Sequence, residues 1–558
     1  MVRRGNLWLY GLVVLLVLLT VYPLTTLFYG SLHTTPPGMA GEYSLAGYAK
    51  VFRLQNLWIL WNSVAIALSK SAIAVALAVL FAWIIARTDT PYRGTLEVLI
   101  TLPFFIPPII TATAWDLLGN PKIGAVNLLW RWLTGTQTTL VNVYSYGGIV
   151  WHMVQHTTPF VFLLIVDAFR AMDPALEESS RMSGASRMQT FWRITLVLML
   201  PVTTSAFILS FMRGIEAFES ALFFGTPDNI QVLVTEIYRA INFDAVPDYQ
   251  YATALAVSIM VFLFMLVLLQ WRLLGGRSFH TVTGKGYSPG IIRLGKWRWV
   301  AFGVCALFFV VAVLLPLGQL FVGSFFRFIG FYGWNMLTLE HWQAVLADRT
   351  IWRSFKNTMI LGLLGSTATM LLGGIVAYVT VRTRWRGRRL VETLAWLPWM
   401  MPGMVLGIGL LWGFAIIPGP IQIYGSIWAL LLAYITLGTP LSVRIMSGSF
   451  AQLSFDLEEC SRVHGANWLQ TLWYILIALS WPAFAVGWTL TFFGIVRELS
   501  ASVLLYAVNA EVLSVVMLNL WTSAKQEQVM VIGLLTMLLV FLFRWVQLVF
   551  IKRRISTL

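Results

Sequence analysis

Long apolar runs alternate with short polar segments along the whole chain of 558 residues. A helix needs about 20 apolar residues to cross a bilayer, and twelve runs come near or above that length. They fall at residues 7–30, 60–86, 97–118, 147–169, 194–215, 251–274, 299–325, 357–381, 393–416, 426–447, 473–495 and 528–550. The pattern predicts an all-α polytopic membrane protein with about twelve transmembrane helices.

Composition agrees with this prediction and excludes other classes of protein. Hydrophobic residues make up 58% of the chain and charged residues only 11%, against about 45–50% and about 25% in soluble domains. A soluble enzyme, a disordered chain and, with two cysteines, a disulfide scaffold are therefore excluded.

The basic residues indicate how the chain lies in the membrane. With twelve spans, 24 of the 38 Lys and Arg residues fall on the side of the N-terminus. Cytoplasmic loops carry the excess of Lys and Arg, so we expect both termini to be cytoplasmic. The net charge of +15 then serves orientation and lipid contact, and we expect no nucleic-acid partner. The basic loops, including 382–389, are expected to be solvated.

The sequence also repeats itself. Residues 61–108 match 356–402, with Asn62-Ser63 opposite Asn357-Thr358 and Arg87-Thr88 opposite Arg382-Thr383. Residues 158–201 match 439–482. Six predicted spans separate the copies, so the two halves are parallel repeats, between which a transport pathway is expected. We assign residues 1–275 to the first repeat, 276–298 to a cytoplasmic linker and 299–558 to the second repeat.

The most informative match is a polar segment between the fourth and fifth spans of each half. Residues 176–190 and 457–471 are identical at nine of fifteen positions. Apolar similarity arises easily in lipid-facing helices, whereas a polar loop needs a reason for it. The shared residues are Glu177, Glu178, Arg181, Gly184 and Ala185 in one copy and Glu458, Glu459, Arg462, Gly465 and Ala466 in the other. Short helices with apolar residues and two acids fit a groove on another protein.

This segment resembles the EAA loop of ABC importer permeases: Glu-Ala-Ala, three residues, Gly, nine residues, Ile-x-Leu-Pro. Here Glu178-Ser179-Ser180 precedes Gly184 and Ile194, and Glu459-Cys460-Ser461 precedes Gly465 and Ile475. Small residues replace the alanines, and Val197 and Ala478 stand where proline is expected. The spacing is kept in both copies, so the chain resembles a fused double-domain permease of a type I importer.

The resemblance implies a specific assembly in the bacterial inner membrane. Each loop would form a cytoplasmic coupling helix that docks on one of two ABC ATPase subunits, while a solute-binding protein delivers substrate outside. ATP and magnesium would bind those partners, because this chain has no Gly-x4-Gly-Lys-Ser/Thr motif and no cofactor of its own is expected. We expect a translocation subunit rather than an enzyme. Among such fused permeases the chain most resembles ferric-iron importers, with thiamine, 2-aminoethylphosphonate and polyamine as alternative substrates.

Polar residues in or near the spans are candidates for the pathway or a gate. His152 and His156 lie one helical turn apart, but nearby carboxylates do not complete a metal site, and a helix-contact role is favoured. Glu216 and Glu219 follow the fifth span, and Arg497 and Glu498 occupy the comparable place in the second half. We expect an outer gate or a binding-protein contact there, with a structural salt bridge as the alternative, and we assign no metal ligand.

Two other classes of protein fit part of the pattern. A secondary transporter driven by an ion gradient would explain twelve spans and two halves, but not the duplicated polar loop. A membrane-embedded enzyme would need a motif such as His-Glu-x-x-His or Gly-x-Ser-x-Gly, and the sequence contains neither.

Overall fold

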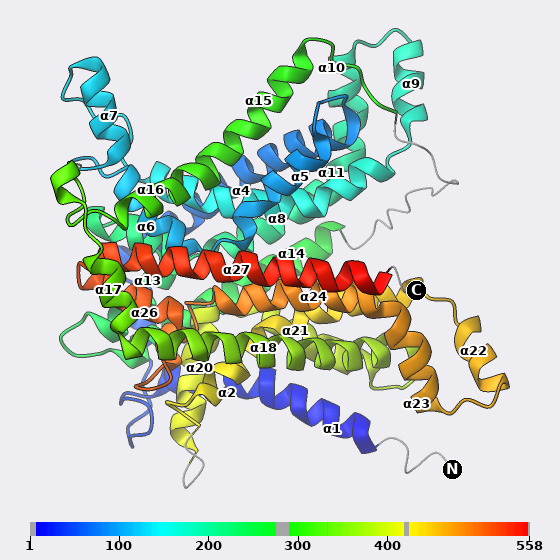
Figure 1. Ribbon diagram of the computed structural model, residues 1–558. Coiled ribbons are helices and arrows are strands. Elements are labelled where there is room, and N and C mark those ends of the chain that lie inside the picture. Colours follow the sequence, from blue (N-terminus) through cyan, green and yellow to red (C-terminus); the bar gives the residue numbers. More distant parts are fainter. Residues whose placement is uncertain (1–6, 275–289, 332, 418–422, 556–558) are drawn as a thin grey trace.

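The computed structural model describes residues 7–274, 290–331, 333–417 and 423–555. Within those ranges the chain is helical, with isolated bridges between extended residues in place of a sheet. Ten helices are long and apolar enough to cross a membrane, and two further pairs of helices qualify together, each as one sharply bent span. The protein is therefore an all-α polytopic membrane protein with ten to twelve membrane helices (Figure 1).

The first half contains six spans, several of them assembled from consecutive helices. Their bounds are α1 (Leu7–Leu16) with η1 (Val17–Val21) and α2 (Tyr22–Leu32); α4 (Leu54–Arg87); α5 (Arg93–Thr101) with η2 (Leu102–Phe105) and α6 (Pro108–Leu118); α8 (Tyr146–Ala171); α10 (Arg187–Thr190) with η3 (Phe191–Thr195) and α11 (Leu196–Ile215); and α14 (Tyr249–Leu274). Shorter helices connect them: α3 (Ala46–Val51), α7 (Ala125–Thr134), α9 (Pro174–Met182), α12 (Glu219–Gly225), η4 (Thr226–Asp228) and α13 (Leu233–Asn242).

The second half repeats this order. Its spans are α15 (Trp297–Phe309) with η5 (Val310–Leu314) and α16 (Leu315–Gly323); α18 (Arg349–Ala377) with η7 (Tyr378–Arg382); α19 (Arg388–Trp396) with η8 (Leu397–Met400) and α20 (Gly403–Ile416); α21 (Ile427–Gln452); α23 (Trp468–Thr471) with η9 (Leu472–Ile477) and α24 (Ala478–Val496); and α27 (Gln526–Ile555). The connecting helices are η6 (Trp334–Met336), α17 (Glu340–Ala347), α22 (Asp456–Val463), α25 (Ser502–Leu505) and α26 (Leu513–Thr522).

The third span of each half departs from the prediction of a plain helix. The runs 97–118 and 393–416 each bend sharply, by 94° between η2 and α6 and by 108° between η8 and α20. Pro107, Pro108 and Pro402 lie at these bends. Proline has no backbone N–H and clashes with the preceding turn, so the helix breaks there.

The two halves interlock through their first spans. From the first half, α2 packs against α20, and from the second half α16 packs against α6. Tyr22 Oη and Thr26 Oγ1 each donate a 2.7 Å hydrogen bond to backbone carbonyls of α20. Asp116 of α6 also accepts hydrogen bonds from the end of the second half, from Trp521 Nε1 of α26 at 3.2 Å and from Gln526 Nε2 of α27 at 3.4 Å. Each bent span is therefore held by the other half.

The repeat markers Asn62-Ser63 and Asn357-Thr358 anchor the short helices α13 and α26. Asn62 Nδ2 donates to the carbonyl of Gln231 at 3.1 Å, and Ser63 Oγ accepts from the N–H of Leu233 at 2.8 Å. In the second half, Asn357 and Thr358 make the equivalent bonds to residues 511 and 513 at 3.0 and 2.9 Å. The connection between α11 and α14 thus contains two largely buried helices, α12 and the anchored α13.

Part of the predicted linker lies outside the described residues, at 275–289. Its following residues run beside the turn after α4, where the N–H of Ile292 donates to the carbonyl of Arg87 at 2.8 Å and the N–H of Leu294 donates to Asp89 Oδ1 at 2.7 Å. The end of the linker is thus attached to the first half.

Candidate functional site

The two duplicated polar segments extend from the same side of the helix bundle. Helices α9 and α22 lie beyond the ends of the long spans, on the side where α1 begins and α27 ends (Figure 1). Asp173 caps α9 by accepting a hydrogen bond from the N–H of Ala175 at 2.8 Å. Both helices carry acidic residues in their first turn, which favours helix formation there.

The first glutamate of each segment faces the protein. Glu177 and Glu458 are only 7% and 5% exposed. Glu177 is paired with the fully buried side chain of Arg87 and accepts a 2.6 Å hydrogen bond from Thr195 Oγ1. Glu458 lies 3.3 Å from Nη1 of Arg382, whose side chain is also buried. These ion pairs tie each segment to the end of span two, and they correct the prediction that Arg382 belongs to a solvated loop.

The glycines form the same turn in both copies. Gly184 and Gly465 adopt φ of +86° and +83°, a left-handed conformation that glycine accepts without strain. Each glycine N–H bonds to the arginine carbonyl three residues earlier, at 3.0 Å in both copies. The alanine N–H that follows bonds to a serine carbonyl, at 3.2 Å for Ala185 and 3.1 Å for Ala466. The next helix then leads back toward the membrane.

The outer face of each segment is open. Glu178, Glu459, Arg181 and Arg462 are exposed, as are the apolar residues Met182 at 89% and Val463 at 84%. Two further apolar pairs, Leu176 with Leu457 and Met188 with Leu469, are exposed at matching positions. Each half therefore presents an acid, a base and apolar side chains on an open surface.

The charged candidates after spans five and eleven meet between the halves. Arg497 Nη1 donates a 2.8 Å hydrogen bond to the carbonyl of Phe104, and its guanidinium lies 4.9 Å from that ring's centre. Arg213 lies 5.8 Å from the ring of Trp399 and 3.2 Å from Glu216. Each arginine thus reaches the bend of the opposite half.

The remaining acids of this cluster belong to the same place. Glu219 lies close enough to Arg497 and Glu498 to interact with their charges. Glu498 Oε1 accepts a 2.8 Å hydrogen bond from the N–H of Ala501, at the start of α25.

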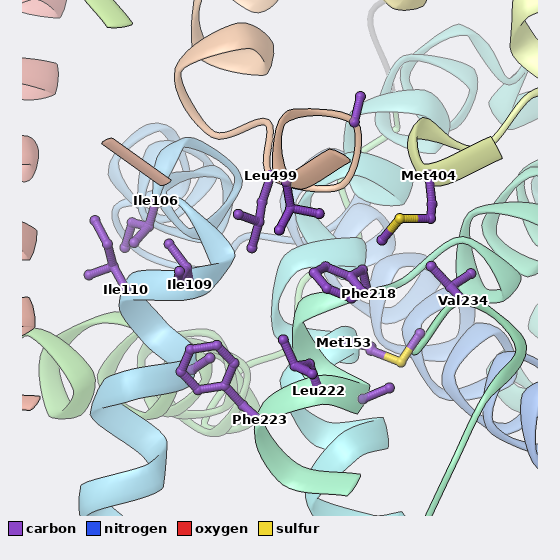
Figure 2. Packing of buried hydrophobic residues seen from close by; sticks show 14 of the residues in the cluster. Ile106, Ile109, Ile110, Met153, Phe218, Leu222, Phe223, Val234, Met404 and Leu499 are labelled. Atoms are coloured by element: carbon purple, nitrogen blue, oxygen red, sulfur yellow. The ribbon is translucent and has the colours of Figure 1, made fainter. Parts of the chain in front are cut away.

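A layer of apolar side chains packs beside these charges. Figure 2 shows Phe218 and Met404 near one another, with Leu499 directed toward the same space and Ile106 and Ile109 on the neighbouring bend. All five are at most 2% exposed, and they come from both halves. The two halves are therefore closed against each other at this level.

The chain has relatives among transport permeases. The family model described as "Binding-protein-dependent transport system inner membrane component" matches it twice, at residues 73–275 and 369–556. The chain belongs to this family. It carries the permease domain twice, as expected for a fused double-domain ABC importer permease, and the family membership argues against the secondary-transporter alternative.

Curated relatives include ferric transport permeases at low identity. The chain is 27% identical over 384 residues to the ferric transport system permease protein FbpB of Actinobacillus pleuropneumoniae, covering 68% of this chain and 54% of the relative. It is 22% identical over 532 residues to the Fe(3+)-transport system permease protein FbpB 2 of Haemophilus influenzae, covering 95% and 94%. The permease spans little more than half the length of the first relatives it matches.

Other relatives and structures match one half. The spermidine/putrescine permease PotB of Salmonella typhimurium is 23% identical over 230 residues, covering 41% of this chain and 79% of the relative. A solved bacterial ABC transporter that imports the acidic polysaccharide alginate aligns with a TM-score of 0.41 at 20% identity, covering 50% of the permease and 98% of that chain.

His152 and His156 belong to a chain of hydrogen bonds around the first bend. His156 Nδ1 lies 3.1 Å from the Pro103 carbonyl, which can only accept, so this nitrogen carries the proton. Thr111 Oγ1 lies 2.7 Å from His156 Nε2 and 2.9 Å from His152 Nε2, and Ser220 Oγ lies 2.7 Å from His152 Nδ1. Pro107 removes the N–H that a helix would direct at the Pro103 carbonyl, and His156 supplies the donor.

A metal site is not formed around these histidines. Across the described ranges, no group of three His, Cys, Asp or Glu is placed to hold a metal ion. The second half has Ala433 and Leu437 at the corresponding positions, so this hydrogen-bond chain belongs to the first bend alone.

Several residues of the site, Arg213 among them, were not sequence candidates. Arg87 and Arg382 appear in the sequence only as repeat markers, and their position opposite the duplicated glutamates is the signal that could have found them. Phe104 and Trp399 also occupy matching positions, 295 residues apart. Their role depends on the bends, which the sequence pattern does not fix.

Proposed function

We propose that the chain is the translocation subunit of an ATP-driven importer, with two ABC ATPase subunits docked on α9 and α22. The observation that carries this proposal is that both segments repeat the same buried ion pair, glycine turn and exposed face. A duplicated surface suits two copies of one partner. ATP and magnesium would bind to those partners.

The proposed orientation places α9, α22 and both termini in the cytoplasm. Basic residues are concentrated on that side in the sequence, as cytoplasmic loops require. The opposite side, with α7, α13 and α17 (Figure 1), would then receive an extracytoplasmic solute-binding protein.

The pathway would run between the halves and close at the two bends. Arg213 and Arg497, each reaching the opposite bend, would form the gate together with Glu216, Glu219 and Glu498. Closure of the ATPases would move α9 and α22, and the ion pairs to Arg87 and Arg382 would transmit that movement to span two of each half. Rigid-body repacking of such an interface is a common form of switching.

Ferric iron is the substrate we propose, because several curated relatives carry that name. A polyamine is the second candidate, since the spermidine/putrescine permease also matches. Uptake into vesicles that contain the assembled importer separates the two, with radiolabelled ferric iron or spermidine supplied together with the binding protein that co-purifies.

Docking is tested by charging the exposed apolar residues of both segments. Met182→Glu with Val463→Glu should abolish recovery of the ATPase with the purified permease, since both side chains are more than four-fifths exposed and their replacement leaves the core unchanged. The measurement is the stoichiometry of the complex by mass spectrometry, which should fall from about two ATPases per permease to none.

Val246→Glu with Val508→Glu is the matched control. These two valines are each 80% exposed and lie one in each half, in the connections after α13 and α25. This variant should keep both ATPases. If the first variant also keeps them, α9 and α22 are not the docking helices and the proposal is wrong.

A further inference from the structure

A basic hollow lies at the start of α19, away from the docking segments. It measures about 480 Å³ and is lined by Arg384, Trp385, Arg386, Arg388 and Arg389. The four arginines are exposed, and none forms an ion pair with a carboxylate in the part of the chain that the structure describes. Four cations so close together repel one another unless an anion lies between them.

The local backbone gives the hollow a defined shape. The ring of Trp385 folds over Gly387, where an added Cβ would lie only 2.3 Å from it. The carbonyl of Trp385 accepts from the N–H of Arg388 at 3.2 Å, and Arg388 Nη1 lies 3.4 Å from the carbonyl of Thr383. The arginines therefore surround a fixed turn, and the positive end of α19 adds to their field.

Exposed apolar side chains lie on α1 and α19, next to the hollow's Trp385. The ring of Tyr10 meets Trp385 edge-on, 6.0 Å between centres. Leu7, Tyr10 and Leu390 are 70%, 60% and 51% exposed, and α1 and α19 both belong to predicted membrane spans. An anion with attached acyl chains would satisfy both kinds of surface, whereas a soluble anion would use only the arginines.

The first half has no such site. The matching turn, residues 89–94, reads Asp89-Thr90-Pro91-Tyr92-Arg93-Gly94 and has one acid and one base. The end of the linker covers it, with the N–H of Asp89 bonded to the carbonyl of Ile292 at 3.2 Å. The basic hollow is therefore a feature of the second half and not a general consequence of the repeat.

We propose that this hollow binds the phosphate headgroup of an anionic phospholipid from the adjacent leaflet. Arginine forks pair with phosphate oxygens in a bidentate manner, and basic pockets on the cytoplasmic side of membrane helices select anionic headgroups. The lipid would hold the N-terminus of α19, the helix that leads into the bend at η8, against the membrane surface. This proposal does not depend on the importer's substrate.

The test compares two double variants of the full chain that lose the same charge. Arg386→Gln with Arg389→Gln removes two arginines of the hollow, whereas Lys296→Gln with Arg298→Gln removes two exposed cations near the start of α15. Native mass spectrometry of the purified permease, titrated with phosphatidylglycerol or phosphatidylcholine, measures lipid binding. We expect the first variant to bind phosphatidylglycerol about 10-fold more weakly or worse, and the second to match the parent chain.

Three results would overturn the proposal. These are equal weakening in both variants, equal binding of the two lipids by the parent chain, and displacement of phosphatidylglycerol by millimolar inorganic phosphate, which would indicate a soluble anion. Arg386→Lys with Arg389→Lys guards against misfolding, because it keeps the charge and should retain most of the binding.

Discussion

The two polar segments share their key residues between the halves, whereas the two bends do not. In and just after α9 and α22, a buried glutamate, an exposed apolar residue and a left-handed glycine recur at matching positions. A surface repeated in this way suits the two ATPase subunits proposed above. The halves remain symmetric where they would contact identical subunits.

The region of the bends shows the opposite behaviour. Glu216 and Arg497 occupy matching positions, 281 residues apart, with opposite charge, and both lie at the junction between the halves. His152 and His156 support the first bend, whereas the second half has Ala433 and Leu437 there. A single substrate passing between the halves meets both at once, so nothing requires them to be alike. Asymmetry at the bends is compatible with the proposed pathway, and symmetry at α9 and α22 is what the proposed docking surface requires.

Of the changes that test this comparison, breaking one buried ion pair should have the largest effect on the stability and ATPase binding of the permease. Arg87→Ala leaves Glu177 buried with only the hydroxyl of Thr195 as an observed partner. Removing one partner of a buried ion pair costs about 3–5 kcal/mol, so α9 should separate from the end of α4. We expect a lower midpoint of thermal unfolding, rapid protease cleavage within 174–190, and loss of one ATPase of two.

Arg382→Ala is the matched change in the second half. Its partner Glu458 keeps a second cation, Arg462 Nη2, at 3.5 Å, so the loss should be smaller than for Arg87→Ala. If both variants lower the midpoint of thermal unfolding equally, Arg462 does not stabilise Glu458 in place of Arg382. The absence of any loss would show that the buried pairs do not hold these segments.

Replacing the arginines that cross between the halves should have the next largest effect. Arg497→Gln removes a charge-assisted hydrogen bond to Phe104, worth about 1.5–3 kcal/mol, which shifts the ratio of closed to open halves about 10- to 100-fold. Arg213→Gln removes an exposed ring contact and an exposed ion pair, each worth about 1 kcal/mol or less. Its shift should therefore be smaller.

Distances between spin labels at Val246→Cys and Val508→Cys measure this equilibrium, since both positions are open and belong to different halves. Cys460 is exposed and must first become serine, whereas Cys305 is buried. If Arg497→Gln leaves the distance distribution unchanged, the contact with Phe104 does not hold the two halves closed.

The sequence was sufficient to predict the parts of this molecule that depend on local pattern. Apolar runs of adequate length predicted the spans, and the duplicated segment at 176–190 and 457–471 predicted two equivalent exposed helices. The repeat markers Asn62 and Asn357 also have equivalent structural roles, because each anchors a short helix in its own half. In each case the evidence is a residue type at a repeated position.

The bends and the ion pairs depend on contacts that a linear pattern does not contain. Proline is tolerated inside membrane helices, so Pro107 and Pro402 did not distinguish a straight span from one bent by 94° or 108°. Arg382 was expected in a solvated loop because its neighbours are basic, but its partner lies on another helix, 76 positions away in sequence. Tertiary contact decided its environment.

Converting the histidine positions of the first half to those of the second should have the smallest effect. His152→Ala with His156→Leu removes one donor to the Pro103 carbonyl, which keeps the N–H of Ile106 at 3.4 Å, and both histidine partners of Thr111, which keeps the carbonyl of Pro108 at 3.0 Å. A lost hydrogen bond costs about 0.5–1.5 kcal/mol, so the midpoint of thermal unfolding should fall by a few degrees. Added ferric iron should not change the size of that loss, because all four ring nitrogens have hydrogen-bond partners within the protein. If iron stabilises the parent permease and this variant loses that stabilisation, the histidines are ligands, and the asymmetry between the bends is one of substrate binding rather than of support.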